Sequence, residues 1–275
     1  MKKACVYFHQ GWTDIINCLP LVNYYNELYD EITILIRSDA KLLFDFYIRN
    51  FTNVKVVYLN TDNGRYYGNF EKTDLTEVEY LPQGNAGLVR IPKDFSIMFH
   101  AEHDIYREDS YKGYWYRSVK KPSNHFVESF YTYYDIPYTS RVSKFDLNRD
   151  VKLEESCYSK FINENTKNYI LYHDDENNHK NGTHHVSTKL NLPKKWKNHS
   201  YINLNKVSPL FFDYIKIIEN AKELHLIDSV WASLCYLLDS RYGLLSSVDV
   251  RVYCKRGHHQ MFIDPVKLSN WQVIL

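Results

Sequence analysis

Apolar positions in the first part of the chain alternate between short continuous runs and segments with the helical period. A run at 4–8 leads to a turn at Gly11, after which a helix-period segment begins. Further runs at 31–36 and 54–59 flank an amphipathic segment at 41–49. Strands that alternate with helices form a parallel sheet with helices packed on it. The pattern therefore predicts a Rossmann-like α/β domain.

The periodicity weakens after the third run. Between 60 and 94 glycines and prolines interrupt the pattern, so we expect loops there, with a short helix at 74–80. A strand is expected at 95–99, followed by an aromatic helix at 124–135 that an Ile-Pro pair ends. The next stretch is charged and is expected to be extended. Its Arg141 is either a phosphate partner or a surface residue.

The alternation starts again near residue 167. The expected elements are strands at 168–172, 201–204, 223–227 and 250–253, with helices at 210–220 and 229–238 and a long polar loop that ends at 197. The chain thus reads as two Rossmann-like, doubly wound domains that face each other across a cleft. We expect their bounds to be 1–155 and 156–275.

Composition excludes some classes of partner. The formal net charge is +1 and no long basic or acidic run occurs, so a nucleic-acid surface is not expected. The 25 tyrosines suit a carbohydrate partner, because sugar rings pack their C–H faces on aromatic rings. A chain rich in Tyr, Asn, Lys and Ile is equally what an AT-rich genome encodes.

The five cysteines form no Cys-x-x-Cys pair, which favours a reducing compartment. With neither a secretory leader nor a membrane-spanning run expected, the protein is predicted to be cytoplasmic.

The loop after the first strand is the first candidate site. In an open α/β sheet, ligands bind beyond the carboxyl ends of the strands. Asp14 begins the helix there and is a candidate general base, while His9, Gly11 and Trp12 are candidates for binding an acceptor. His100 follows the strand expected at 95–99 and is a further acceptor-side candidate; the alternative is a residue of a solvated loop.

A second candidate site lies where the apolar run 223–227 passes into a helix. Asp228 and Ser229 are good N-cap residues, and the helix N-terminus that they open suits a diphosphate, or is a plain capped helix. His173 ends the first strand of this half and is a candidate donor to a phosphate oxygen. Lys195 is a phosphate candidate or a solvated lysine.

Both stretches carry a resemblance to one family. Gly11-x-x-Asp14-Ile15-Ile16-x-x-Leu19-Pro20-Leu21 resembles the amino-terminal signature of heptosyltransferase-like glycosyltransferases of the GT-B architecture, from which it departs by the added pair at positions 12 and 13. Asp228-Ser229-x-x-x-Ser233-Leu234 is similar to the donor motif of the same family, with Val230 in place of the usual glycine. The resemblance implies that Asp14 is the base and that Asp228, Ser229 and Ser233 bind the donor.

The sequence lacks the usual signatures of metal and cofactor sites. Asp-x-Asp, His-Glu-x-x-His, Gly-x-Ser-x-Gly, P-loop and Gly-x-Gly-x-x-Gly patterns are all missing. The resemblance implies a glycosyltransferase that moves a sugar from a nucleotide-diphosphate sugar to a glycan hydroxyl with inversion and without a further cofactor, and the missing Asp-x-Asp leads us to expect that it is metal-independent. The alternative is a silent carbohydrate- or nucleotide-binding protein in which Asp14 caps a helix. An enzyme that modifies nucleotide-sugars on a Rossmann fold is a third hypothesis, against which the missing glycine fingerprint counts.

Overall fold

The computed structural model divides the chain into two compact units, Met1–Asp146 and Leu147–Leu275. The sequence pattern predicts this boundary after residue 155. The residues that the structure describes are 1–8, 12–62, 65–70, 79–83, 86–90, 95–99, 104–108, 113–117, 126–132, 135–163, 166, 168–174, 190, 200–204, 210–254 and 270–274.

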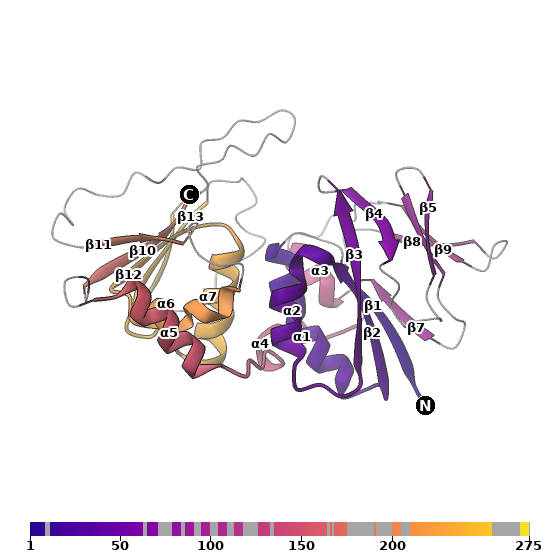
Figure 1. Ribbon diagram of the computed structural model, residues 1–275, viewed down its shortest axis with the longest axis horizontal. Coiled ribbons are helices and arrows are strands. Elements are labelled where there is room, and N and C mark those ends of the chain that lie inside the picture. The colour runs from indigo at the N-terminus through magenta and orange to yellow at the C-terminus, as the bar shows by residue number, and fades with distance from the viewer. Residues whose placement is uncertain are drawn as a thin grey trace. The chain divides into compact units, whose positions relative to one another are not determined.

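A mainly parallel sheet forms the centre of the first unit (Figure 1). Its strands, in the order β4-β3-β2-β1-β7, are β4 (Arg65–Phe70), β3 (Val54–Asp62), β2 (Glu31–Arg37), β1 (Lys3–Phe8) and β7 (Phe95–Phe99). The first strand lies between two parallel neighbours, while β4 runs antiparallel to β3. The strands predicted at 31–36, 54–59 and 95–99 are confirmed.

The loops expected between 60 and 94 are largely replaced by strands. A second sheet of four antiparallel strands has the order β5-β6-β9-β8, with β5 (Glu79–Gln83), β6 (Ala86–Arg90), β9 (Gly113–Arg117) and β8 (Asp104–Glu108). The helix predicted at 74–80 is wrong at 79 and 80, which belong to β5, and its remainder lies outside the described residues. Aromatic and β-branched residues favour strands even when glycines and prolines interrupt them.

Helices bury the apolar side chains of the first unit. They are α1 (Trp12–Asn26), α2 (Lys41–Ile48), which the short 3-10 turn η1 (Ser38–Ala40) precedes, α3 (Phe126–Thr132) and α4 (Ser140–Ser143). Phe8 of β1 lies 6.2 Å from Phe44 of α2, ring centre to ring centre, and both are fully buried. The extended stretch expected from residue 141 onward is wrong at its start, because Arg141 belongs to α4 and is only 1% exposed.

The second unit contains a parallel sheet with the order β11-β10-β12-β13-β14. Its strands are β10 (Tyr169–His173), β11 (Ser200–Asn203), β12 (Glu223–Ile227), β13 (Asp249–Tyr253) and β14 (Trp271–Ile274). Every adjacent pair is parallel. The expected closing strand, β13, is therefore not the edge, because the carboxyl-terminal segment adds β14 beside it. Short polar-flanked strands such as Trp271–Ile274 give little periodicity to recognise.

Helices α5 (Val151–Phe161), α6 (Ile215–Glu219) and α7 (Val230–Tyr242) pack in the second unit, and the 3-10 turn η6 (Phe211–Tyr214) leads into α6 (Figure 1). Register places Tyr169 and Trp271 on the same face of the sheet. The Tyr169 hydroxyl donates to the Ile217 carbonyl of α6 at 2.6 Å, and the Trp271 indole donates to Asp239 of α7 at 2.8 Å. Both helices therefore cover that face.

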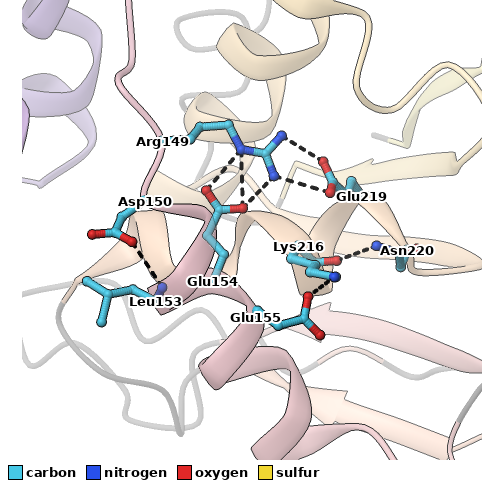
Figure 2. Close-up of polar contacts among 8 residues, drawn as sticks. All are labelled: Arg149, Asp150, Leu153, Glu154, Glu155, Lys216, Glu219 and Asn220. Carbon is cyan, nitrogen blue, oxygen red and sulfur yellow. Dashed lines mark hydrogen bonds and ion pairs between the residues drawn. The ribbon is translucent and has the colours of Figure 1, made fainter.

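An ion-pair network fastens the start of α5 to α6 (Figure 2). Arg149 donates to Glu154, with Nε 2.9 Å from Oε1, and to Glu219, with Nη1 3.0 Å from Oε2. The Asp150 side chain caps α5 by accepting from the Leu153 amide at 3.1 Å. Glu154 is 2% exposed, so its charge depends on Arg149 for compensation.

Among the helices that the structure describes, none combines the length and the apolar character needed to cross a membrane.

Candidate functional site

The carboxyl end of β1 leads into α1 and places Asp14 in the first turn of that helix. This confirms the position expected from the sequence. The Asp14 side chain is 8% exposed, and a carboxylate at a helix N-terminus is stabilised by the helix dipole. Because β1 is flanked by β2 and β7, Asp14 lies in the first turn of a helix beyond a central strand of a mainly parallel sheet, where α/β folds bind ligands.

A buried polar cluster lies one helical turn after Asp14. Asn17 is fully buried, and its side-chain amide donates to the Thr13 carbonyl at 2.7 Å. The Asn17 side-chain oxygen accepts from Nε of Arg141 at 3.0 Å, and its main-chain oxygen accepts from the Tyr131 hydroxyl at 2.6 Å. The side chain of Asn17 therefore joins α1 to Arg141 of α4. It also bonds to the main chain of Thr13, the residue that precedes Asp14.

Electrostatics in this cluster are those of a dry interior. Burial raises the pKa of the Cys18 thiol well above its ordinary value, Asp14 raises it further, and Arg141 opposes the rise. Burial likewise raises the pKa of the Tyr131 hydroxyl well above its ordinary value. Both groups are therefore neutral near pH 7, while Asp14 and Arg141 act on the same thiol with opposite signs.

The other acceptor-side candidates are only partly described. Trp12 is the first residue of α1 and is partly exposed. His9, Gly11 and His100 lie outside the described residues. Asp14 and Trp12 thus belong to the same helical turn, and the placement of the other three stays a prediction.

The second parallel sheet brings His173 and Ser229 together at its carboxyl edge. His173 is the last residue of β10, and register pairs it with Leu226 of the neighbouring strand β12. Ser229 Oγ lies 2.8 Å from Nδ1 of His173, although the residues are 56 positions apart in sequence. The tautomer of the imidazole decides which group donates. His173 is 8% exposed and Ser229 is 1% exposed, so this hydrogen bond lies in a nearly dry environment.

Ser229 is the N-cap residue of α7, but its side chain makes no capping hydrogen bond. Its hydroxyl is oriented toward His173 instead. A serine N-cap usually satisfies one of the first amide N–H groups of its helix. Here the Ser229 hydroxyl bonds to the imidazole and not to an amide of its own helix. The dipole of the 13-residue helix α7 makes this end of the helix electropositive.

Two residues that the sequence analysis did not select complete the polar edge. Asp174 follows His173 and is 3% exposed, and its Oδ1 accepts from the side-chain amide of Asn203, at the end of β11, at 3.4 Å. The other carboxylate oxygen accepts from the Leu190 amide at 3.4 Å. A polar residue at the end of each adjacent strand is the sequence signal that could have identified them.

The motif residues Asp228 and Ser233 are both buried. Asp228 is 1% exposed, and its amide donates to the Tyr253 carbonyl at 3.2 Å, which ties the start of α7 to the end of β13. Burial raises the pKa of the Cys254 thiol to about 11, and the Asp228 charge adds to that rise. Ser233 is fully buried one turn inside α7. Lys195 lies outside the described residues.

The arrangement provides two separate chemical tools. One is a carboxylate at the start of α1, able to accept a proton. The other is a helix N-terminus with an adjacent imidazole, able to donate hydrogen bonds to an anion. Within the part of the chain that the structure describes, no three His, Cys, Asp or Glu side chains form a group that could hold a metal ion.

Comparison with known proteins adds little. No family model matches the sequence, and neither does any curated protein. One solved structure, described as the glycosyl transferase family 9 from Veillonella parvula DSM 2008, is similar to this chain at 10% identity and a TM-score of 0.46. The similarity covers 99% of this chain and 85% of that one. A similarity at this level carries no conclusion about the fold or the function of this chain.

Proposed function

We propose that the protein is a glycosyltransferase that moves a sugar from a nucleotide-diphosphate sugar to a carbohydrate hydroxyl, without a metal ion and with inversion at the anomeric carbon. The observation that carries the proposal is the polar edge of the second sheet, where His173 meets Ser229 at the N-terminus of α7. Ligands of parallel sheets bind at such edges, and helix N-termini bind phosphates.

On the donor side, the first amides of α7 and the imidazole of His173 hold the diphosphate. The hydrogen bond of 2.8 Å between Ser229 Oγ and Nδ1 of His173 orients the ring at the N-terminus of α7, where an imidazole N–H can donate to a phosphate oxygen. As the glycosidic bond to the diphosphate breaks, the same donors stabilise the negative charge that develops on the leaving oxygen.

On the acceptor side, Asp14 is the general base. The acceptor hydroxyl oxygen attacks the anomeric carbon, the bond from that carbon to the diphosphate oxygen breaks, and the hydroxyl proton passes to the Asp14 carboxylate. The products are the glycoside and the nucleoside diphosphate. A single displacement inverts the anomeric centre. The proposal includes a GT-B arrangement, in which acceptor and donor edges face a common cleft.

A thermal-shift screen against UDP, GDP and ADP tests the donor side. A ligand that binds only the folded protein stabilises it by about 2.7 kcal/mol at a concentration 100 times its dissociation constant. We expect one nucleotide to raise the melting temperature without added metal. The variants Ser229→Ala and His173→Gln should lose most of that rise, whereas Lys216→Met, a surface change in the same unit, should retain it.

Product analysis separates transfer from silent binding. With the matching nucleotide-sugar and a panel of glycan acceptors, the proposal predicts a new glycoside of inverted anomeric configuration, detected by NMR. A nucleotide that stabilises the protein without any transfer or hydrolysis would favour the silent binding protein. The absence of stabilisation by all three nucleotides and their sugars would overturn the donor site itself.

A further inference from the structure

Arg141 is an unusual residue for the interior of the first unit. It is 1% exposed and is the largest fully buried side chain in the described part of the chain. A buried guanidinium is costly unless hydrogen bonds and an opposite charge compensate it. Two of its hydrogen bonds go to neutral groups, with Nε 3.0 Å from the Asn17 side-chain oxygen and Nη1 2.8 Å from the Tyr138 hydroxyl.

The buried carboxylate that accompanies it is Asp14. Among the described residues of Met1–Asp146, the charged side chains that are buried are Asp14 and Arg141, and they have opposite signs. Asp14, Asn17 and Cys18 are spaced by three and four residues on α1, so they share one face of the helix. Arg141 contacts that face through Asn17, and the Cys18 thiol responds to both charges.

A mechanical connection accompanies the electrostatic one. Arg141 holds the side-chain oxygen of Asn17, and the amide nitrogen of the same side chain holds the carbonyl of Thr13 at 2.7 Å. The Tyr131 hydroxyl holds the main-chain oxygen of Asn17 at 2.6 Å. The backbone immediately before Asp14 is therefore fixed by a chain of hydrogen bonds that begins at the guanidinium.

We propose that Arg141 is a positioning residue for Asp14: it supplies the buried positive charge that keeps the carboxylate ionised, and through Asn17 it fixes the first turn of α1. This inference deepens the proposed function and rests on it for the role of Asp14 as base. Arg141 acts through Asp14 and Asn17 and does not itself touch the substrate.

The groups around Asp14 make the expected pH behaviour specific. On its own helix lies Cys18, whose thiol responds to the charges of Asp14 and Arg141. Around Cys18 and Arg141 lie Tyr131 of α3 and Tyr138, which precedes α4. The pKa values of Cys18 and Tyr131 are raised well above their ordinary values, so neither group takes up a proton in the acid range. Within this described set, Arg141 is the one cation that favours the ionised carboxylate.

The first experiment requires no enzymatic activity. Urea unfolding of Arg141→Met, Asp14→Asn and the double variant forms a double-mutant cycle. In the wild-type background, Asp14→Asn leaves the buried Arg141 guanidinium without the Asp14 charge. In the Arg141→Met background, the same substitution removes a buried carboxylate that has already lost the Arg141 charge. We therefore expect the two substitutions to be non-additive by about tenfold or more in the unfolding equilibrium constant. Lys144→Met, which removes a surface cation paired with Glu27, is the control. Its effect on the unfolding free energy should be additive with that of Asp14→Asn.

Additivity of Arg141→Met with Asp14→Asn would overturn the inference. If Arg141→Met does not fold, Arg141→Lys replaces it in the cycle, because it keeps the charge but loses the planar fork, and the coupling should then shrink without vanishing.

The second experiment uses the donor and acceptor identified for the proposed function. Arg141→Met should move the acid limb of the pH–rate profile to higher pH, because a carboxylate without its neighbouring cation takes up a proton more readily. Arg141→Lys should leave the limb near its wild-type position. A loss of rate in Arg141→Met that is the same at every pH would show that Arg141 has a merely structural role. It would overturn the claim that Arg141 keeps the Asp14 carboxylate ionised. Coupling without any transferase activity would refute the proposed function alone.

Discussion

Replacing Arg149 by methionine should strongly destabilise the second unit. Arg149 forms hydrogen-bonded ion pairs with Glu154 and Glu219, both of which are shown in Figure 2. Methionine keeps most of the aliphatic stem, so the change removes the charge and the donors with little loss of packing. It leaves the Glu154 carboxylate, 2% exposed, without its cation.

The structure sets the size of the effect. Removing one partner of a fully buried pair costs roughly 3–5 kcal/mol. The Arg149 side chain is 25% exposed and that of Glu219 is 24% exposed, so water can enter and solvate part of the stranded charge. We therefore expect a loss of about 2–4 kcal/mol in the free energy of unfolding. With a denaturant slope of about 2 kcal/mol per molar, the urea midpoint falls by about 1–2 M.

The pH dependence has a definite sign. Hydrogen bonding to Glu154 is the largest cause that raises the pKa of Arg149 above its ordinary value. A raised pKa stabilises the folded state at all pH values below the ordinary pKa and ceases to do so only when pH rises through the folded-state value. The difference between wild type and Arg149→Met should therefore stay constant between about pH 6 and pH 9.

Urea unfolding, followed by circular dichroism, gives the midpoints, and hydrogen exchange of peptides from α5 and α6 locates the loss in the second unit. Lys216→Met is the matched control, because it removes a cation from the surface pair with Glu155 in the same layer and should leave the midpoint almost unchanged. Adding Glu154→Gln to Arg149→Met should restore part of the stability. An Arg149→Met midpoint equal to that of the control would refute the reasoning.

Three further substitutions or modifications have defined outcomes. Gly243→Ala should cost about 1–2 kcal/mol of stability in urea unfolding from backbone strain alone, because Gly243 ends α7 at a φ of 66° and an added Cβ would meet no atom within 4 Å; a neutral result would contradict this. Tyr169→Phe leaves the buried Ile217 carbonyl without its donor, which should lower the free energy of unfolding by about 1–3 kcal/mol, and an unchanged urea midpoint would exclude it. Burial raises the pKa of the Cys254 thiol from 9.0 to about 11, so iodoacetamide at pH 8 should meet about a hundredfold less thiolate in the folded protein than in urea, and similar labelling rates would disprove that shift.

The apolar runs predicted the parallel strands well. The sequence Glu-Leu-His-Leu-Ile was expected as a strand at 223–227 and forms β12 with those bounds. Its neighbour α7 was expected from Ser229, which is the N-cap. Both are local patterns, because a buried parallel strand is apolar along its length and a helix start carries a cap residue.

Other features depend on contacts between distant residues. The strands β5, β6, β8 and β9 pair through sequences that contain glycine, proline and many tyrosines, and the local pattern there resembles loops. The sequence leaves Arg141 as either a phosphate partner or a surface residue, but Asn17, 124 positions earlier, gives it a buried partner. The contact between His173 and Ser229 likewise follows from the register of β10 with β12.

The most direct test of the central claim compares sugar transfer by wild type and Asp14→Asn, both saturated with the nucleotide-sugar that the thermal-shift screen identifies. Asparagine keeps the size of the side chain at the start of α1 but cannot accept the proton. The account predicts an unchanged rise in melting temperature with the nucleotide and a turnover number lower by about 100-fold or more, the usual contribution of a general base. Turnover by Asp14→Asn equal to that of the wild type would contradict it.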